Sequence, residues 1–230
     1  MTLEVLRRYV PMSLRRVARA AWKRQEFGRA MHRLMALAPG AAPQRQLLAD
    51  LQAGWDNKGF TAEVDYLAEL ARLAVGTAGP VLECGSGLTT VLLGALAGRR
   101  GVDIWTLEHD PGWWRRVTAA LRRHGLPEVH LCLSDLRDYG DFTWYDPPLG
   151  IMPQDFRLVV CDGPPGTTRG GRFGLVPVMG DRLPLGAVIL LDDADRVGEQ
   201  LALRRWTSEA SLRVTFGPLS GERFAWITRC

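Results

Sequence analysis

Apolar positions near the start of the chain recur at the spacing of a helix. They are Leu14, Val17, Ala18, Ala21 and Trp22. Arginines fill most of the positions around them, so the segment that begins at Pro11 is predicted to be an amphipathic helix with a basic opposite face. The stretch APGAAPQ, Ala38–Gln44, breaks the pattern and predicts a linker. We therefore divide the chain into a basic helical extension, residues 1–42, and a single domain, residues 43–230.

Two more helical patterns precede the first strand-like run, and they cover Gln44–Ala53 and Thr61–Val75. The second pattern offers Thr61 as an N-cap and Glu63 as an acid in the first turn, where a carboxylate interacts favourably with the helix dipole. We therefore expect two helices between the linker and the sheet.

From Gly79 onward, strand-like apolar runs alternate with helical patterns. The candidate strands lie within residues 80–85, 102–109, 129–135, 156–163, 187–193, 211–217 and 223–229. Such alternation predicts right-handed crossovers and a mostly parallel α/β sheet that is covered on both faces. Only the five residues PLSGE separate the last two candidate strands, so we expect a hairpin there and one antiparallel strand.

The positive charge of the protein is concentrated in its first forty residues. The whole chain of 230 residues carries a formal net charge of +4, whereas residues 1–40 carry +7 and the remainder carries −3. The basic character therefore belongs to the helical extension and says little about the domain. Two interpretations of the basic helix stay open: docking on an anionic lipid surface or a partner, and packing on the domain with a solvated basic face.

Composition narrows the remaining partners and the compartment. Nucleic acid is not an expected partner, because basic and aromatic residues do not alternate along the extension as they do on strand-binding surfaces. No apolar run reaches the roughly 18 residues of a membrane span. The four cysteines form no CxxC pair, and we expect them to be buried, reduced thiols; they are Cys84, Cys132, Cys161 and Cys230. We predict a cytoplasmic protein, peripheral at the membrane if the basic helix binds lipid, and a homo-oligomer is compatible with the sequence.

The segment VLECGSGLTT ends the first candidate strand in a glycine turn. Gly85, Ser86 and Gly87 form this turn at the sheet edge where α/β proteins bind ligands, and where backbone must approach the ligand closely. A dinucleotide fingerprint would need glycine where this chain has Thr90, and a P-loop would need Gly-Lys-Ser/Thr. A carboxylate at Glu83 would repel a pyrophosphate but attract the sulfonium and ammonium groups of S-adenosylmethionine. That molecule is the cofactor we predict.

Polar residues end the next strands as well. Glu108 ends the second candidate strand, where a carboxylate can accept hydrogen bonds from both hydroxyls of a ribose, and His109 stands beside it. Ser134 and Asp135 end the third candidate strand, in position to contact an adenine edge, and Asp162 ends the fourth. Together with the glycine turn, these residues form the predicted cofactor-binding set.

These motifs resemble those of the class I S-adenosylmethionine-dependent methyltransferases. The resemblance covers Thr61–Cys230 and rests on LECGSGLTT, LEHD, LSDL and LVVCDGPPG, with Thr89 where the family often has a third glycine. It implies a Rossmann-like fold with a seven-stranded, mostly parallel sheet whose last strand is antiparallel. It also implies an enzyme that transfers a methyl group from S-adenosylmethionine.

Three carboxylates are predicted to converge beside this pocket. Asp162 ends the fourth candidate strand, Asp192 and Asp193 end the fifth, and neighbouring strands lie about 5 Å apart. Uncompensated, these charges would repel one another, and a divalent cation such as Mg²⁺ or Ca²⁺ would relieve the repulsion. The arrangement resembles metal-dependent O-methyltransferases of the catechol, macrocin and glucuronoxylan types, in which a corresponding acidic set holds a metal that binds the acceptor oxygen. The alternative is that Asp193 and Asp195 cap the following helix.

On that resemblance, Asp162 and Asp192 are predicted to be catalytic, because the metal they hold would lower the pKa of the acceptor hydroxyl and orient it. Catechol-type enzymes carry a lysine shortly after the fourth-strand aspartate, where this chain reads GPPGTTRGG. Lys58 and His109 are the remaining candidates for the base. His109 is included in the predicted catalytic set, and the identity of the base stays open.

The acceptor is predicted to be a small molecule or a saccharide. Arg169 and Arg172 lie in TTRGGRFG, which we expect to be a flexible loop beside the site. Arginines in such a place suit a carboxylate or phosphate on the acceptor, so both are predicted to bind substrate. The alternative is a solvated loop.

Two other functions stay open. The segment WYDPPL, Trp144–Leu149, is similar to the Asp-Pro-Pro-aromatic motif of amino-methyltransferases, which would give a metal-independent enzyme acting on nitrogen of a nucleic-acid base or a protein. Leu149 stands where a ring would stack on a flipped base, so we expect a proline-rich loop near the site instead. The other alternative is a non-catalytic methyltransferase-like scaffold. The presence of Glu83, Glu108 and Asp162 together argues against it.

Overall fold

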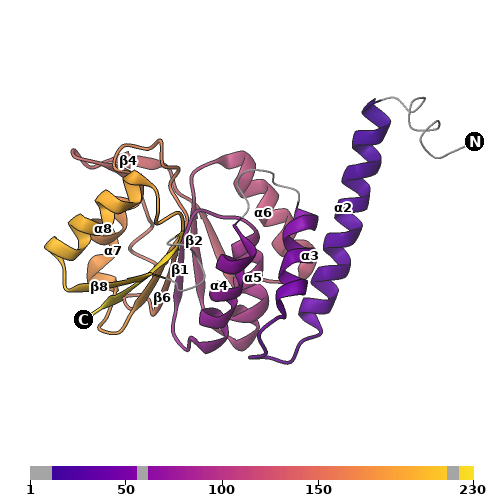
Figure 1. The fold of residues 1–230 in the computed structure, drawn as a ribbon, viewed down its shortest axis with the longest axis horizontal. Helices are drawn as coiled ribbons and strands as arrows, with labels where there is room; N and C mark the ends of the chain where they lie inside the picture. Colours follow the sequence, from indigo (N-terminus) through magenta and orange to yellow (C-terminus); the bar gives the residue numbers. More distant parts are fainter. Residues whose placement is uncertain (1–11, 56–61, 217–222) are drawn as a thin grey trace, which may run out of the picture.

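A computed structural model describes residues 12–55, 62–216 and 223–230. Seven strands pair in the order β3-β2-β1-β6-β7-β9-β8 (Figure 1). Their bounds are β1 Val81–Cys84, β2 Ile104–Glu108, β3 Val129–Leu133, β6 Leu158–Cys161, β7 Val188–Leu191, β8 Leu212–Phe216 and β9 Ala225–Arg229. The first five are parallel to one another, whereas β9 runs antiparallel to both β7 and β8. The predicted α/β architecture with an antiparallel last strand is therefore confirmed.

Helices cover both faces of the sheet, as Figure 1 shows. The helices are α2 Met12–Met35, α3 Arg45–Trp55, α4 Val64–Gly76, α5 Leu88–Leu96, α6 Pro111–His124, α7 Leu175–Met179 and α8 Val197–Glu209, with short 3-10 turns η1 Gly98–Arg100, η2 Gly171–Gly174 and η3 Gly180–Arg182. Alternate residues of each strand enter different apolar clusters. Val81 packs with helices α2 to α6, whereas Leu82 packs with η2, α7 and α8. This two-sided burial explains why the parallel strands read as continuous apolar runs.

The helices before the sheet begin slightly later than the sequence predicts. Helix α3 starts at Arg45, and α4 starts at Val64 with Glu63 in the position just before it. Asp65, rather than Glu63, therefore supplies the acid of the first turn of α4. The predicted cap, Thr61, and the PLSGE turn lie outside the described residues.

The two halves of helix α2 differ in their contacts with the domain. Its second half packs on α3 through Phe27, Ala30, Met31 and Leu34, which are buried in the same cluster as the helices of the sheet. Its first half projects past the end of α3 (Figure 1). The predicted extension is therefore anchored to the domain by its carboxyl-terminal half.

A second, two-stranded sheet was not predicted. Strands β4 Leu136–Asp138 and β5 Thr143–Tyr145 form an antiparallel hairpin on the α7–α8 side of the main sheet. Trp144 and Tyr145 are fully buried there. The prediction that the whole WYDPPL segment is a loop was therefore wrong for its first two residues, because both rings pack into the core. The turn signal was present, since Gly140 lies between aspartates in DYGD and has a φ of 92°.

The burial of the cysteines agrees only in part with the expectation that they are buried, reduced thiols. All four cysteines are free; Cys84 and Cys161 are buried opposite each other in β1 and β6, Cys132 is half-buried and Cys230 is exposed. Among the residues that the structure describes, the helices are all too short or too polar to cross a bilayer.

Candidate functional site

The candidate site lies at the edge of the sheet where the parallel strands end. Backbone hydrogen bonds continue the ladder one residue past each strand: Gly85 N–H donates to Leu107, Asp162 N–H to Cys84 and Asp192 N–H to Cys161. The residues after β1, β6 and β7 are thereby brought side by side. The structure thus brings the glycine turn and the predicted acids to one edge, the usual place for a ligand in an open α/β sheet.

The glycine turn passes very close to the loop after β6. Gly85 has a φ of 87°, in the left-handed region, and a Cβ placed on it would lie 3.2 Å from the Cα of Gly163. Both constraints favour glycine at this position. Beyond the turn, Gly87 N–H donates to Thr90 Oγ1 at 2.8 Å, which closes the first turn of α5. The backbone of the turn is therefore held rigidly at the start of a helix.

Glu83 lies beneath the turn and not on its surface. Its side chain is buried, and it accepts a hydrogen bond from the Thr106 hydroxyl at 2.8 Å. Burial raises the pKa of Glu83 to about 7, against the lowering effect of the hydroxyls of Thr89, Thr90 and Thr106. Its other oxygen, Oε1, is buried without a partner among the described residues. In this geometry Glu83 supports the turn through threonines, and its raised pKa weakens the attraction for a cationic ligand that the sequence predicts.

Glu108 joins the end of β2 to the glycine turn. Its Oε2 accepts hydrogen bonds from both the backbone N–H and the hydroxyl of Ser86, at 3.0 and 2.6 Å, and its Oε1 accepts from Asp110 N–H at 2.8 Å. His109 Nδ1 lies 3.3 Å from the same Oε1. Burial raises the pKa of Glu108, but the hydrogen bonds from His109, Ser86 and Asp110 outweigh it and leave the pKa lowered. An ionised carboxylate is thus held next to the turn, and the pKa of His109 is raised by its hydrogen bond to Glu108.

The two polar residues after β3 differ in their placement. Ser134 is buried, its N–H donates to the Glu108 carbonyl, and its hydroxyl has no partner among the described residues. Asp135 is exposed. A buried hydroxyl without a partner next to Glu108 is a feature that a bound ligand would satisfy, so Ser134 fits the predicted cofactor site better than Asp135 does.

The acidic cluster contains Asp162, Asp192 and Asp193, as the sequence predicts. One carboxylate oxygen from each lies within 4.8 Å of the others. Burial raises the pKa of Asp162 to about 6 and that of Asp192 to about 8, and the neighbouring aspartates add to both shifts, whereas Arg172 opposes them. Neither Asp193 nor Asp195 caps α8, because the N-cap position is Arg196 and no side chain there accepts a capping hydrogen bond.

Arg172 is not placed as expected. The predicted flexible loop contains the 3-10 turn η2, and the Arg172 side chain is only 2% exposed. Its Nη2 donates to Asp162 Oδ1 and to Asp193 Oδ2, both at 2.9 Å. The prediction that Arg172 contacts the acceptor is therefore replaced by an internal role, because its charge is already used within the cluster. Arg169 remains half-exposed and pairs with Asp138 of the hairpin.

The residues present do not fit a resident divalent cation. The premise for a metal was that the three carboxylates are uncompensated, but Arg172 lies among them and Arg196 Nη1 also contacts Asp193 Oδ2 at 2.7 Å. Two of the three candidate ligands thus already hold a guanidinium. No step of the chemistry discussed below is routed through a metal.

Tyr145 was missed by the sequence analysis as a member of this site. Its ring lies 6.1 Å from that of His109, and its hydroxyl is buried without a partner among the described residues. A Cβ on Gly163 would lie 2.3 Å from that hydroxyl, so the Asp162–Pro164 loop passes directly over it. Burial raises the pKa of Tyr145 well above its ordinary value, so the phenol is neutral.

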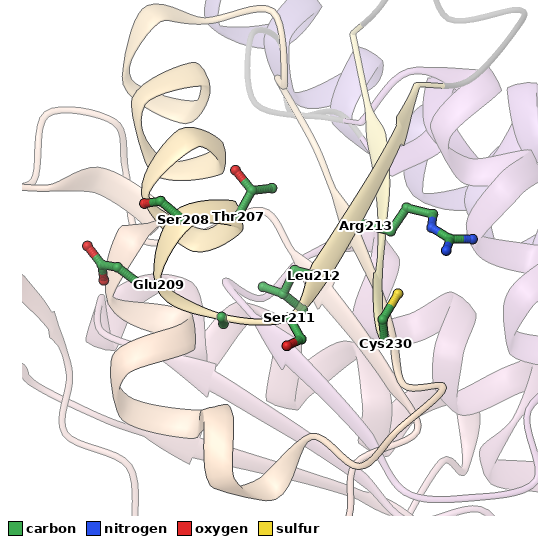
Figure 2. Close-up of a pocket in the computed structure, with 8 residues that line it drawn as sticks. Thr207, Ser208, Glu209, Ser211, Leu212, Arg213 and Cys230 are labelled. Atoms are coloured by element: carbon green, nitrogen blue, oxygen red, sulfur yellow. The ribbon is translucent and has the colours of Figure 1, made fainter.

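The hollow shown in Figure 2 lies elsewhere. It has a volume of about 590 Å³ and is lined by the last turn of α8, the start of β8 and the end of the chain, with Ser208, Arg213 and Cys230 among its residues. Leu212 pairs with Arg229, which places this hollow at the sheet edge opposite to Asp192. It is therefore separate from the candidate site.

The fold is that of known methyltransferase structures. An O-methyltransferase from Bacillus cereus in complex with SAH has a TM-score of 0.54 and 14% identity, over 82% of this chain and 92% of that one. Cofactor-bound Rv0187 from MTB has a TM-score of 0.55 and 21% identity, over 80% and 88%. Precorrin-6y C5,15-methyltransferase from Geobacter metallireducens has a TM-score of 0.54 and 15% identity, over 74% and 89%. The TM-scores establish a shared Rossmann-like methyltransferase fold, whereas the sequence identities are low.

At the level of sequence the chain stands apart. No protein-family model matches it, and no curated protein is significantly similar to it. The functional argument therefore rests on the fold and on the geometry of the site.

Proposed function

We propose that the protein is an S-adenosylmethionine-dependent methyltransferase that methylates a hydroxyl oxygen of a small molecule or a saccharide. Solved structures with this fold include an O-methyltransferase in complex with SAH and another protein described as cofactor-bound. The observation that carries the proposal is the contact between Ser86 and Glu108, which sets an ionised carboxylate beside a rigid glycine turn. A carboxylate in this position can accept hydrogen bonds from two ribose hydroxyls when they replace the Ser86 hydroxyl and His109.

The cofactor would be held by the elements around that contact. Gly85 and Gly87 let the backbone approach the ligand, Glu108 would accept from the ribose hydroxyls, and the free hydroxyl of Ser134 would contact the adenine. S-adenosylmethionine supplies a methyl group on a positively charged sulfur. His109 is engaged with Glu108, so its proposed part is to orient that carboxylate and not to act on the acceptor.

The acceptor would lie toward the acidic cluster. Asp162 is committed to Arg172, whereas Asp192 accepts only the backbone N–H of Asp193 in a described hydrogen bond of its carboxylate. We assign the ionised form of Asp192, which predominates only above its raised pKa of about 8, as the group that would take the hydroxyl proton while the acceptor oxygen replaces sulfur on the methyl carbon. Lys58, the other candidate base, lies outside the described residues. The predicted Mg²⁺ has no step in this proposal.

Arg169 is the remaining candidate for an anionic group on the acceptor, because it is half-exposed on the loop before η2. Because Arg172 is buried and paired with aspartates, it does not require an acidic group on the acceptor, and an uncharged acceptor is equally compatible with the site. We further propose a reducing, cytoplasmic setting, which the free and buried thiols of Cys84 and Cys161 support.

Calorimetry and a transfer assay test the proposal. S-adenosylmethionine and SAH are titrated into the full chain, and labelled methyl transfer is then measured with catechols, uronic acids and glycosides, each with and without EDTA. Binding of both ligands and transfer to a hydroxyl are expected. Binding with transfer only to nucleic acid or protein nitrogen would favour the alternative enzyme, and the lack of any binding would identify a scaffold.

A further inference from the structure

We propose that Arg172 is the built-in cation of the acidic cluster, so that the cluster binds no divalent metal. The guanidinium contacts carboxylates from the ends of two neighbouring strands, Asp162 after β6 and Asp193 after β7. It thereby occupies the position between the strands that a cation would need. Its Nε also lies 3.6 Å from the buried Glu199 of α8.

Arg172 is fixed in this place by backbone as well as by charge. Its Nη1 donates to the Asp192 carbonyl and its Nη2 to the Asp162 carbonyl, the second at 3.3 Å. The next residue, Phe173, accepts a hydrogen bond from Trp206 Nε1 at 2.8 Å. Because a guanidinium cannot lose its proton at any ordinary pH, the cluster carries a permanent positive charge at its centre.

Asp193 contacts two arginines through one carboxylate oxygen. Its Oδ2 accepts a hydrogen bond from Arg172 at 2.9 Å and forms an ion pair with Arg196 Nη1 at 2.7 Å, so two guanidinium groups neutralise that oxygen. Its backbone has a φ of 53°, the left-handed region that few residues other than glycine adopt. Strain of this kind persists where the surrounding contacts hold it, and here those contacts are the two arginines.

A magnesium ion would need a different arrangement of the same atoms. It requires near-octahedral oxygen ligands at about 2.0–2.1 Å, so Asp162 and Asp193 would have to turn their oxygens away from Arg172. That would leave a buried guanidinium without its two aspartate partners, which is costly. The cluster therefore favours the internal cation over an exchangeable one.

Manganese binding to the full chain tests this inference without any measurement of turnover. We expect the EPR signal of free Mn²⁺ to be the same with and without the wild-type protein. We also expect that neither Mn²⁺ nor EDTA shifts the Tm of the wild type. We expect Arg172→Gln to gain Mn²⁺ binding and to be stabilised by it, because the carboxylates then lack their cation. Arg172→Lys keeps a charge and should bind no manganese, and Arg169→Gln serves as the control arginine.

Binding of Mn²⁺ by the wild type that is lost in Asp192→Asn would overturn the inference. If Arg172→Gln does not fold, the wild-type and Arg172→Lys measurements decide the question alone. This test is independent of the proposed function: binding of S-adenosylmethionine can be measured in EDTA, and that result stands whether or not the wild type binds Mn²⁺.

A second inference comes from a different part of the molecule: we infer that the first half of α2 docks on an anionic lipid surface. Leu14, Val17 and Trp22 are 58%, 66% and 59% exposed on this helix. At 100° per residue, Leu14 and Trp22 lie roughly 120–160° around the helix from Phe27 and Leu34, which face the domain, and Val17 lies roughly a quarter turn from them. The centre of the exposed apolar stripe therefore points away from the protein body.

The charge around this stripe selects the partner. Arg15, Arg16, Arg19 and Arg24 are exposed in the same half of α2, and the sequence has no acid between Met12 and Gln25. An apolar stripe with a basic remainder is the pattern of helices that lie in the interface of a membrane, where each lysine or arginine strengthens binding to an anionic surface. The ribbon of α2 projects past the end of α3 in this part of the helix (Figure 1).

Vesicle co-sedimentation of the full chain tests this second inference. We expect binding to vesicles of phosphatidylglycerol and phosphatidylcholine, less binding at high salt, and none to phosphatidylcholine alone. Val17→Asp combined with Trp22→Asp should abolish binding. The matched control is Val197→Asp combined with Leu201→Asp, which changes two exposed apolar residues of α8 and should leave binding intact. Equal binding by both double variants, or a dimer in solution that only the α2 variant disrupts, would overturn it.

Discussion

Ser86 donates both its backbone N–H and its hydroxyl to the same carboxylate oxygen of Glu108, at 3.0 and 2.6 Å. One residue belongs to the turn after β1 and the other ends β2, so this pair fixes the distance between two neighbouring strand ends. A nucleoside that bridges those strand ends would meet a preorganised carboxylate. Because both oxygens of Glu108 are already engaged, the ribose hydroxyls would have to replace the Ser86 hydroxyl and His109 as its partners.

Glu108→Gln should lower the affinity for SAH by at least about tenfold, because a neutral amide cannot accept two charge-assisted hydrogen bonds from a ribose. Isothermal titration calorimetry measures the effect. Asp103→Asn, which changes an exposed carboxylate before β2, is the control and should bind as the wild type does. Equal losses in the two variants would show that Glu108 acts only through net charge.

Gly85→Ala and Gly101→Ala form a matched pair, because both glycines have positive φ values, 87° and 77°. A Cβ at Gly101 meets nothing within 4 Å, whereas one at Gly85 meets the Gly163 backbone at 3.2 Å. Each variant should lose about 1 kcal/mol of stability from the left-handed backbone, and Gly85→Ala should lose more and bind SAH more weakly. Denaturant unfolding measures the stabilities. Similar losses of stability in the two variants would mean that the glycine turn and the loop at Gly163 can move apart without cost.

Glu83 should make stability depend on pH. Its folded pKa of about 7 lies above its ordinary value of 4.5, because burial disfavours the charged form. Between these values the folded protein holds a proton that the unfolded chain has released, so stability falls as pH rises through this window. Glu83→Gln cannot ionise, so its Tm relative to the wild type should rise as pH is raised from about 4.5 to about 7 and then level off. A constant Tm difference across that range would contradict this account of Glu83.

Tyr145→Phe removes a buried hydroxyl that has no described partner, so stability should stay within about 1 kcal/mol of the wild type or increase. Tyr66→Phe is the comparison, because the Tyr66 hydroxyl donates to the Leu190 carbonyl at 3.5 Å and its loss leaves that long contact unmade. Thermal unfolding of both variants, with and without SAH, gives the result. A loss of stability in Tyr145→Phe that SAH does not change would show that the hydroxyl has a structural partner.

The sheet could be predicted because burial on both faces leaves a simple trace in the sequence. The runs that contain Val81, Ile104 and Leu158 are mostly apolar, with Glu83 and Thr106 as buried polar exceptions, and Glu108 and Asp162 mark the carboxyl ends of β2 and β6. The acids of the site could be located for the same reason. Their adjacency follows from the strand order β2-β1-β6-β7, which is a property of the fold that the sequence resembles and not of the alternation alone.

What each acid does could not be predicted, because it depends on partners distant in sequence. Arg172 reaches Asp193 across 21 positions, and nothing in TTRGGRFG indicates that the arginine folds inward. Glu83 and Glu108 look alike as strand-end carboxylates, yet one has its pKa raised by burial and the other has it lowered by four donor contacts. The inward packing of Trp144 and Tyr145 was hidden by the prolines that follow them.

A crystal structure of the full chain with SAH tests the central claim most directly. We predict that the ribose hydroxyls lie within hydrogen-bond distance of Glu108, with the nucleoside over the turn formed by Gly85, Ser86 and Gly87. Nucleoside density at any other place on the sheet, or a site that stays empty at saturating SAH while the fold is intact, would contradict it.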